Sequence, residues 1–100
     1  MSSKNEIAND KIASFIVDVS PFYTGEAKCF RVTPKMKTLR GAETEYVVVA
    51  ASEKKIIGRD QTAIFPSDSR GNVETYLPIK TFHFVDIVQA LGDMGYETKF

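Results

Sequence analysis

The side chains of this sequence best suited to nucleophilic or general-base chemistry are Cys29 and His83, and each is the single residue of its type. A cysteine or serine nucleophile needs a base within hydrogen-bond reach, so a triad of the usual kind would have to use His83. No G-x-S-x-G motif, which presents a nucleophilic serine on a sharp turn, occurs in the chain. We therefore expect a protein that is not an enzyme, with Cys29 as a small buried or half-buried residue.

The sequence also lacks the usual ligands for metal ions and the usual motifs for nucleotides. One cysteine and one histidine cannot supply the four ligands of a structural zinc site. The polar segment SDSRGN offers oxygens of Asp68 and Asn72 to calcium, yet it lacks the acidic series and the distal glutamate of an EF-hand. These residue types are also those that favour a chain reversal, so we interpret the segment as a turn. No Walker or G-x-G-x-x-G motif is present, and no cofactor is expected.

Charge points to one local alternative. The 13 basic and 13 acidic residues cancel, so the chain lacks the overall positive charge that is typical of nucleic-acid-binding domains. Two polar segments hold basic residues that would form one patch if both loops lie at the same end of the sheet. Acidic residues are interleaved with them, which favours a solvated rim. The candidates for contact with nucleic acid are Lys35, Lys37, Arg40, Lys54 and Lys55.

The aromatic pair Phe22–Tyr23 lies between Pro21 and Gly25, in a segment typical of a turn. Aromatic side chains on an exposed loop are frequent anchors of protein interfaces. The same two rings could instead cover the core. They are the candidates for contact with a protein partner.

Apolar runs in the first half of the chain predict the sheet that positions these residues. Residues 13–19 and 27–33 are typical of strands, and the turn at 20–26 should join them as a hairpin. A proline, a glycine and basic residues at 34–44 indicate a long loop. The valine-rich run 45–52 is typical of a strand that is central or covered on both faces.

The second half begins with another expected hairpin. Residues 62–66 are typical of a strand, and we expect 73–79 to return along it after a tight point at Gly71–Asn72. The period then changes to that of a helix, which Thr81 is expected to cap, with His83 in the first turn.

The helix is expected to end at Met94. Gly95 then takes the left-handed conformation, so that Leu91 and Tyr96 form the contact pair of a Schellman ending. The residues after Gly95 are expected to be extended.

These elements predict an α+β fold with a single antiparallel sheet of four to five strands and one C-terminal helix packed on a face. We expect a flexible arm at 1–11 and one domain at 12–100. The polar N-terminus lacks the apolar core of a signal peptide, and no apolar run approaches the roughly 20 residues that span a bilayer. A cytoplasmic protein with no membrane partner is expected.

Four segments together resemble a pattern in small uncharacterised bacterial and bacteriophage proteins. The pattern contains a strand ending in V-T-P, a valine-rich strand, an F-P-[AS]-D-x-x-G-x-V hairpin and a helix ending in A-L-x-x-x-G-Y-E. No activity or ligand is assigned to such proteins, so the resemblance implies a setting and no site residue. The matching segments are FRVTP (30–34), YVVVAAS (46–52), TAIFPSDSRGNV (62–73) and ALGDMGYE (90–97).

The sequence thus predicts a small non-catalytic protein-interaction domain, such as a phage or mobile-element accessory protein that binds a host protein. The alternative is a weak nucleic-acid-binding domain that uses the basic loops 35–40 and 54–59. An unpaired sheet edge also offers a route to a homodimer.

Overall fold

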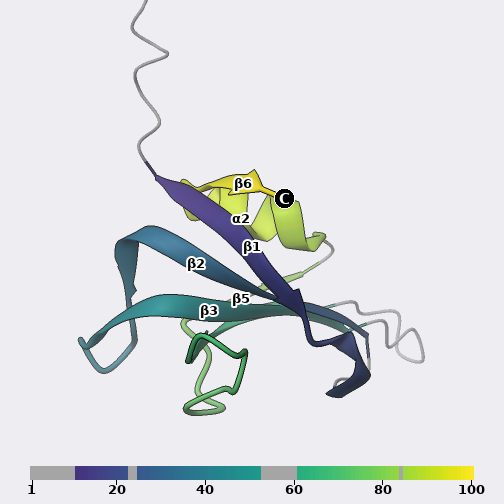
Figure 1. Cartoon of the computed structure of the whole chain (residues 1–100), viewed down its shortest axis with the longest axis horizontal. Helices are drawn as coiled ribbons and strands as arrows, with labels where there is room; N and C mark the ends of the chain where they lie inside the picture. Colours follow the sequence, from purple (N-terminus) through teal and green to yellow (C-terminus); the bar gives the residue numbers. More distant parts are fainter. Residues whose placement is uncertain (1–10, 23–24, 53–60, 84) are drawn as a thin grey trace, which may run out of the picture.

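The computed structural model describes residues 11–22, 25–52, 61–83 and 85–100. Of the arm expected at 1–11, only Lys11 lies within these ranges. The described residues form an α+β fold, as expected (Figure 1). Its elements are β1 (Ile12–Asp18), the 3₁₀ helix η1 (Ser20–Phe22), β2 (Glu26–Lys37), β3 (Glu43–Ser52), β4 (Gln61–Ser67), β5 (Lys80–His83), α2 (Ile87–Asp93) and β6 (Glu97–Lys99).

The strands form one sheet in the order β5-β4-β3-β2-β1-β6. Neighbouring strands are antiparallel except for β1 and β6, which are parallel. The expectation of four to five antiparallel strands is therefore wrong in the number of strands and in their uniform direction. The sixth strand confirms that the residues after Gly95 are extended. It pairs with the other end of the chain, where Ile12 lies opposite Glu97, and no local pattern predicts that pairing.

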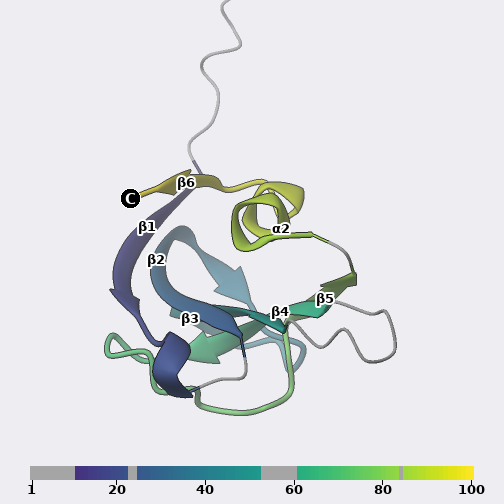
Figure 2. The same ribbon diagram turned by 90° about the vertical axis from the view of Figure 1, so that its right-hand side faces the viewer.

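The sheet curls into a half-barrel, and helix α2 lies across its open side, between β5 and β6 (Figure 2). The main core fills the space between the sheet and the helix. A smaller cluster lies on the outer face of the sheet and includes Val19, Ala27, Cys29 and Val48. Because β3 contributes to both clusters, its valine run is covered on both faces, as predicted. The buried side chains of the main core include Phe30, Val47, Val49, Ile64, Ile87 and Leu91.

Strand β2 is longer than the sequence indicates. It continues to Lys37, and β3 begins at Glu43, so the loop expected at 34–44 is wrong over its first four and last two residues. The register with β3 shifts between Arg31 and Met36, and Pro34 lies within this irregular stretch. A proline can occupy a strand there because its missing N–H interrupts no regular ladder bond.

The second hairpin forms with a different partner strand. Strand β4 pairs with β5, whereas residues 73–79 form no strand. They meet β4 through an isolated bridge between Ser67 and Val73 and through single backbone bonds from Glu74 N and Ile79 N. The strand expected at 73–79 is therefore wrong. Pro78 lies in this segment and cannot donate to a ladder, which limits regular pairing.

Helix α2 begins later than expected. The carboxylate of Asp86 accepts a hydrogen bond from Gln89 N at 2.7 Å, so Asp86 is the N-cap and Thr81 is not. Thr81 and His83 lie on β5 instead of in a first helical turn. The available edge of β4 decides this, because pairing and burial in tertiary structure outweigh a weak local helical preference.

The C-terminal end of the helix is confirmed. Gly95 has a φ of 91°, and its N–H donates to Gly92 O at 2.9 Å. Tyr96 N donates to Leu91 O, also at 2.9 Å. These are the two bonds of a Schellman motif. No helix within the described ranges is long and apolar enough to cross a membrane.

Candidate protein-interaction surface

The turn after β4 uses its polar groups on itself. The Asp68 carboxylate accepts hydrogen bonds from Arg70 N at 2.8 Å, Asn72 N at 2.9 Å and Asn72 Nδ2 at 3.1 Å. These bonds, above all that from Asn72 N, hold the pKa of Asp68 below its ordinary value. Gly71 closes the turn with a φ of 86° and a bond from its N–H to Asp68 O. The segment is a turn, as interpreted from its sequence. Its tight point is Ser69–Arg70 and not Gly71–Asn72, because the closing bond runs from Gly71 N to Asp68 O.

Cys29 and His83 do not form a catalytic pair. The Cys29 side chain is fully buried on the outer face of the sheet, 3.9 Å from Ser67 Oγ. Burial raises the pKa of the thiol, which disfavours the reactive thiolate. His83 is exposed on β5, and β3 and β4 separate that strand from β2, which carries Cys29.

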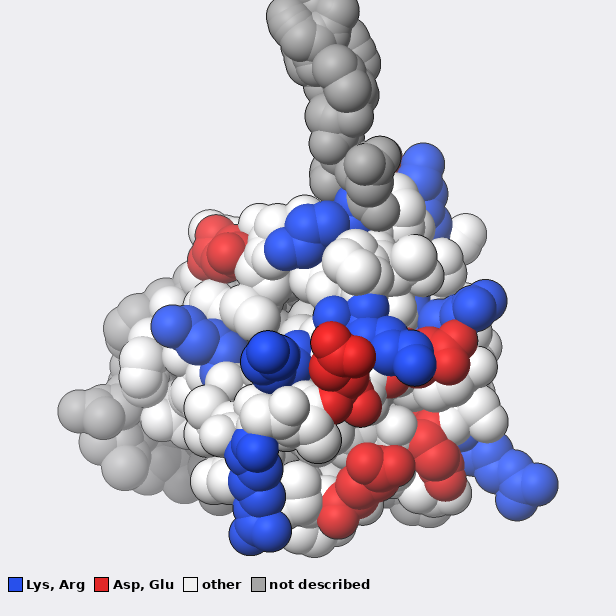
Figure 3. All heavy atoms as spheres, turned by 90° about the vertical axis from the view of Figure 1, so that its left-hand side faces the viewer, with Lys and Arg blue, Asp and Glu red and all other residues white. Residues whose placement is uncertain are grey.

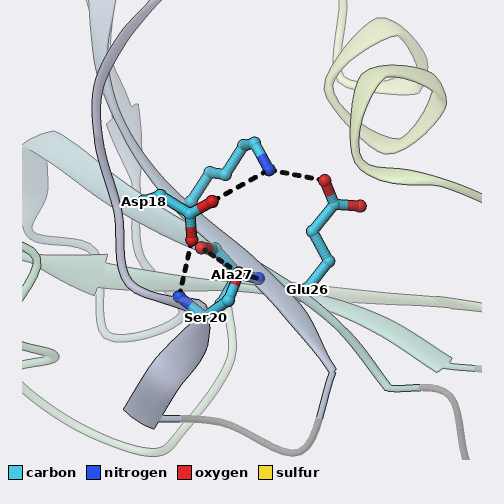
Figure 4. A network of polar contacts seen from close by, with 5 residues as sticks. Asp18, Ser20, Glu26 and Ala27 are labelled. Carbon is cyan, nitrogen blue, oxygen red and sulfur yellow. Dashed lines mark hydrogen bonds and ion pairs between the residues drawn. The ribbon is translucent and has the colours of Figure 1, made fainter.

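The segment that carries Phe22 and Tyr23 has a firmly connected base. Phe22 ends η1, but its side chain and all of Tyr23 lie outside the described residues. Below them, Ser20 N donates to Asp18 Oδ1 at 2.8 Å, Ala27 N donates to Ser20 Oγ at 2.9 Å, and Ser20 Oγ donates to Ala27 O at 3.2 Å (Figure 4). The end of β1 is thereby joined to the start of β2.

An ion-pair bridge strengthens the same base. Lys28 Nζ lies 3.4 Å from Asp18 Oδ2 and also contacts the Glu26 carboxylate (Figure 4). The hydrogen bond to Glu26 is the main cause of the raised pKa of Lys28. The hydrogen bonds from Ser20, more than Lys28, lower the pKa of Asp18. The segment that carries Phe22 and Tyr23 is therefore flanked on both sides by residues that hydrogen bonds and ion pairs join to one another.

A groove opens between the turn that joins β2 to β3 and the segment that follows the β4 turn. In Figure 1 these are the lower left end of the β2–β3 hairpin and the green loop below β3. The groove has a volume of about 160 Å³, and Leu39, Pro66 and Leu77 are among its lining residues. Leu39 is 64% exposed and Leu77 is 43% exposed. Two large apolar side chains are therefore open to a partner across this groove.

An aromatic ring lies next to Leu77 in the chain. Tyr76 is 79% exposed, and its ring packs edge-on against that of Phe65 at a centroid distance of 6.3 Å. Phe65 belongs to β4, so the sheet supports the ring of Tyr76 from below. Neither Leu39 nor the Tyr76–Leu77 pair was identified from the sequence, where the alternation at 73–79 indicates a strand.

The groove also carries charged side chains. Arg40, Glu43 and Glu74 are among its lining residues. None of the ion pairs between described residues involves any of the three. The groove therefore combines one cation and two carboxylates with its apolar walls.

The residues expected to contact nucleic acid are only partly described. Lys35 and Lys37 are exposed on β2, and Arg40 is exposed in the turn before β3. Lys54 and Lys55 lie outside the described residues. Strand β3 begins at the first loop and ends at the second, so the two basic loops connect to opposite ends of a ten-residue strand.

Charge on this side of the molecule is mixed. Figure 3 shows the face that includes the end of the β2–β3 hairpin, and acidic side chains lie there among and below a row of basic ones. A phosphate backbone would therefore meet both signs of charge.

Compared with protein-family models, with functionally described proteins and with solved structures, the chain matches none. A functional proposal therefore depends on the geometry of the groove and of the residues that flank the Phe22–Tyr23 segment.

Proposed function

We propose that this chain is a small non-catalytic protein-interaction domain whose contact surface is the groove and the apolar side chains around it. The observation that supports this is the exposure of Leu39 and Leu77, which two segments far apart in the sequence bring to one groove. Tyr76, next to Leu77 in the chain, is also exposed. Single exposed apolar residues are ordinary on a protein surface. Several gathered at a groove with a charged rim are typical of an interface.

The Phe22–Tyr23 segment is a second contact within the same proposal. The residues on either side of it, Ser20 and Ala27, are joined by hydrogen bonds, so these two residues require little ordering when a partner docks. The resemblance to small bacterial and bacteriophage proteins supports a setting in which a phage or mobile-element protein binds a host protein in the cytoplasm.

A pull-down with matched variants tests the proposal. We expect the wild-type chain to capture a defined host protein, and both Leu39→Ala/Leu77→Ala and Phe22→Ala/Tyr23→Ala to weaken capture about tenfold or more, as loss of an interface anchor does. Val88→Ala is the matched control, because Val88 is 47% exposed on α2 and is not among the lining residues of the groove. If both double variants retain the wild-type partner, the proposal is wrong.

A weak nucleic-acid-binding domain is the second candidate. It is favoured by Lys35, Lys37 and Arg40, which are exposed and form no ion pair with another described residue. This function predicts a mobility shift of DNA or RNA that weakens steeply with salt. Lys35→Gln/Lys37→Gln should reduce the salt dependence as well as the affinity. Absence of any shift at low salt would exclude this candidate.

A further inference from the structure

The groove has the size of a pocket for a single side chain. A cavity of about 150 Å³ lined by apolar residues accommodates one benzene molecule, and this groove has a volume of about 160 Å³. Sites for drug-sized ligands and cofactors take about 300–1,000 Å³. One phenyl or leucyl side chain therefore fits between Leu39 and Leu77, and a cofactor does not.

The charged side chains of the groove determine which charge is favoured in the residues next to the inserted side chain. Glu43 and Glu74 line the groove, and neither pairs with a cation in the described part of the chain. Arg40 is the only cation among the lining residues. With two carboxylates and one cation, the lining has a net negative charge, although Lys37 lies opposite Glu43 in the register of β2 and β3. The lining therefore favours a basic group over an anionic one.

The walls of the groove are held in place before anything binds. Thr38 N donates to Ala42 O at 2.7 Å and closes the turn that carries Leu39. Glu74 N donates to Pro66 O at 2.9 Å and ties the opposite wall to β4. A pocket that is already formed requires little ordering on binding, so less of the binding free energy is lost when an occupant enters.

We propose that the groove binds a peptide segment of the partner that inserts one large apolar side chain, phenylalanine or leucine, between Leu39 and Leu77. A neighbouring lysine or arginine of that segment pairs with Glu43 and Glu74. This inference depends on the proposed function, because it names the kind of partner segment that the interaction domain recognises.

Amide spectra of the ¹⁵N-labelled full chain, titrated with capped tripeptides, test the inference. The probes are acetyl-Lys-Phe-Lys-amide, acetyl-Glu-Phe-Glu-amide and acetyl-Lys-Ala-Lys-amide. We expect the first to shift the amides of Leu39 to Thr44 and of Glu74 to Leu77. The second should bind about tenfold more weakly because its carboxylates face those of the groove. The third should shift none of these amides, because it lacks the ring that fills the pocket.

Two variants assign the effect to the carboxylates. Glu43→Gln/Glu74→Gln keeps the size of both side chains and should abolish the preference for the Lys-Phe-Lys probe. Because Arg40 remains in the lining, the Glu-Phe-Glu probe should then bind at least as tightly as the Lys-Phe-Lys probe. Asp93→Asn, at an exposed carboxylate on α2, should leave their ratio unchanged. The same spectra show whether each variant is folded.

Several outcomes would overturn the inference: no shifts with any probe, equal shifts with both phenylalanine probes on the wild-type chain, or shifts outside the groove. The proposed function fails separately. If a captured partner stays bound to Leu39→Ala/Leu77→Ala but is lost from Phe22→Ala/Tyr23→Ala, the protein-interaction function is supported and the proposal that the groove binds the partner is wrong. If the Lys-Phe-Lys probe binds in the groove but no partner is captured, peptide binding by the groove is supported and the proposed function is wrong.

Discussion

Position 71 requires glycine for two reasons, its backbone conformation and its close contact with Val19. Its φ of 86° lies in the left-handed region, which L side chains rarely adopt. A Cβ at this position would also lie 2.8 Å from Val19 Cγ1, which belongs to the outer-face cluster. The turn after β4 is thus packed against the sheet as well as bonded to itself.

Gly71→Ala is expected to lower the free energy of unfolding by about 2–4 kcal/mol, from the unfavourable φ and the clash with Val19. Gly41→Ala is the matched control, because Gly41 has a φ of 88° and no atom within 4 Å of the added Cβ. Its loss should be only about 1 kcal/mol. Urea denaturation measures both values. Equal losses for the two variants would show that the contact with Val19 has no energetic weight.

Burial of Cys29 gives a second prediction at this scale. The pKa of the thiol is raised from 9.0 by burial, so the unfolded chain releases this proton before the folded chain does. The contribution of Cys29 to stability is therefore full below pH 9 and is lost as pH rises toward the folded pKa.

The stability of the wild-type chain, measured by urea denaturation from pH 7 to above pH 9, is expected to fall more steeply at the alkaline end than that of Cys29→Ala. The comparison removes the contribution of Tyr96, whose pKa burial also raises. In the folded protein at neutral pH the thiol should not react with a thiol-specific reagent. Rapid labelling of native protein, or parallel pH profiles, would contradict the buried position.

Among the elements, α2 shows how a short helix depends on its caps. It has seven residues, too few to be stable by intrinsic preference alone. Its start is defined by the bond from Gln89 N to Asp86, and its end by the Schellman bonds at Gly95 and Tyr96. Ile87, Ala90 and Leu91 then bury one face in the main core.

Asp86→Ala is expected to lower the free energy of unfolding by about 0.5–2 kcal/mol, through loss of the N-cap bond. Thr81→Ala, at the position that the sequence indicated as the cap, should change it by less than about 0.5 kcal/mol, since Thr81 is exposed on β5. Thermal or urea unfolding of the two variants measures the difference. A larger loss for Thr81→Ala than for Asp86→Ala would place the helix start where the sequence alone suggested.

For the whole molecule, α2 has the further effect of covering the opening of the half-barrel. The chain runs from β5 through α2 to β6, so the helix joins the two edge strands of the sheet (Figure 2). These edges have only four and three residues, and each carries an exposed lysine, Lys80 or Lys99. Short edges with lysine side chains discourage the addition of another strand.

The homodimer suggested by the sequence would have to form through one of these edges. We expect instead a single chain in solution, because β5 and β6 offer few backbone groups and place a charge beside them. Light scattering over a concentration series measures this, and Lys80→Thr is the informative variant, since it removes the charge from the β5 edge. A wild-type mass that rises toward that of two chains would contradict the expectation.

The sequence by itself determined the features that short-range interactions produce. The turn at Asp68 and Gly71, the helix ending at Gly95 and the hairpin of β1 with β2 all depend on residues close together in the chain. Their side-chain and backbone preferences agree with their tertiary setting, so local reasoning is sufficient. The two-sided burial of β3 belongs here as well, because a run of valines has no polar face to expose.

Only the tertiary structure decided the features that depend on residues far apart. Residues 80–83 form a strand instead of a helical turn because β4 offers them an edge. The C-terminal residues become a sixth strand because β1 lies beside them. The groove exists because the β2–β3 turn and the segment at 74–77 meet in space. Whether Leu39, Tyr76 and Leu77 are buried or exposed depends on that arrangement of the whole chain, and no local spacing encodes it.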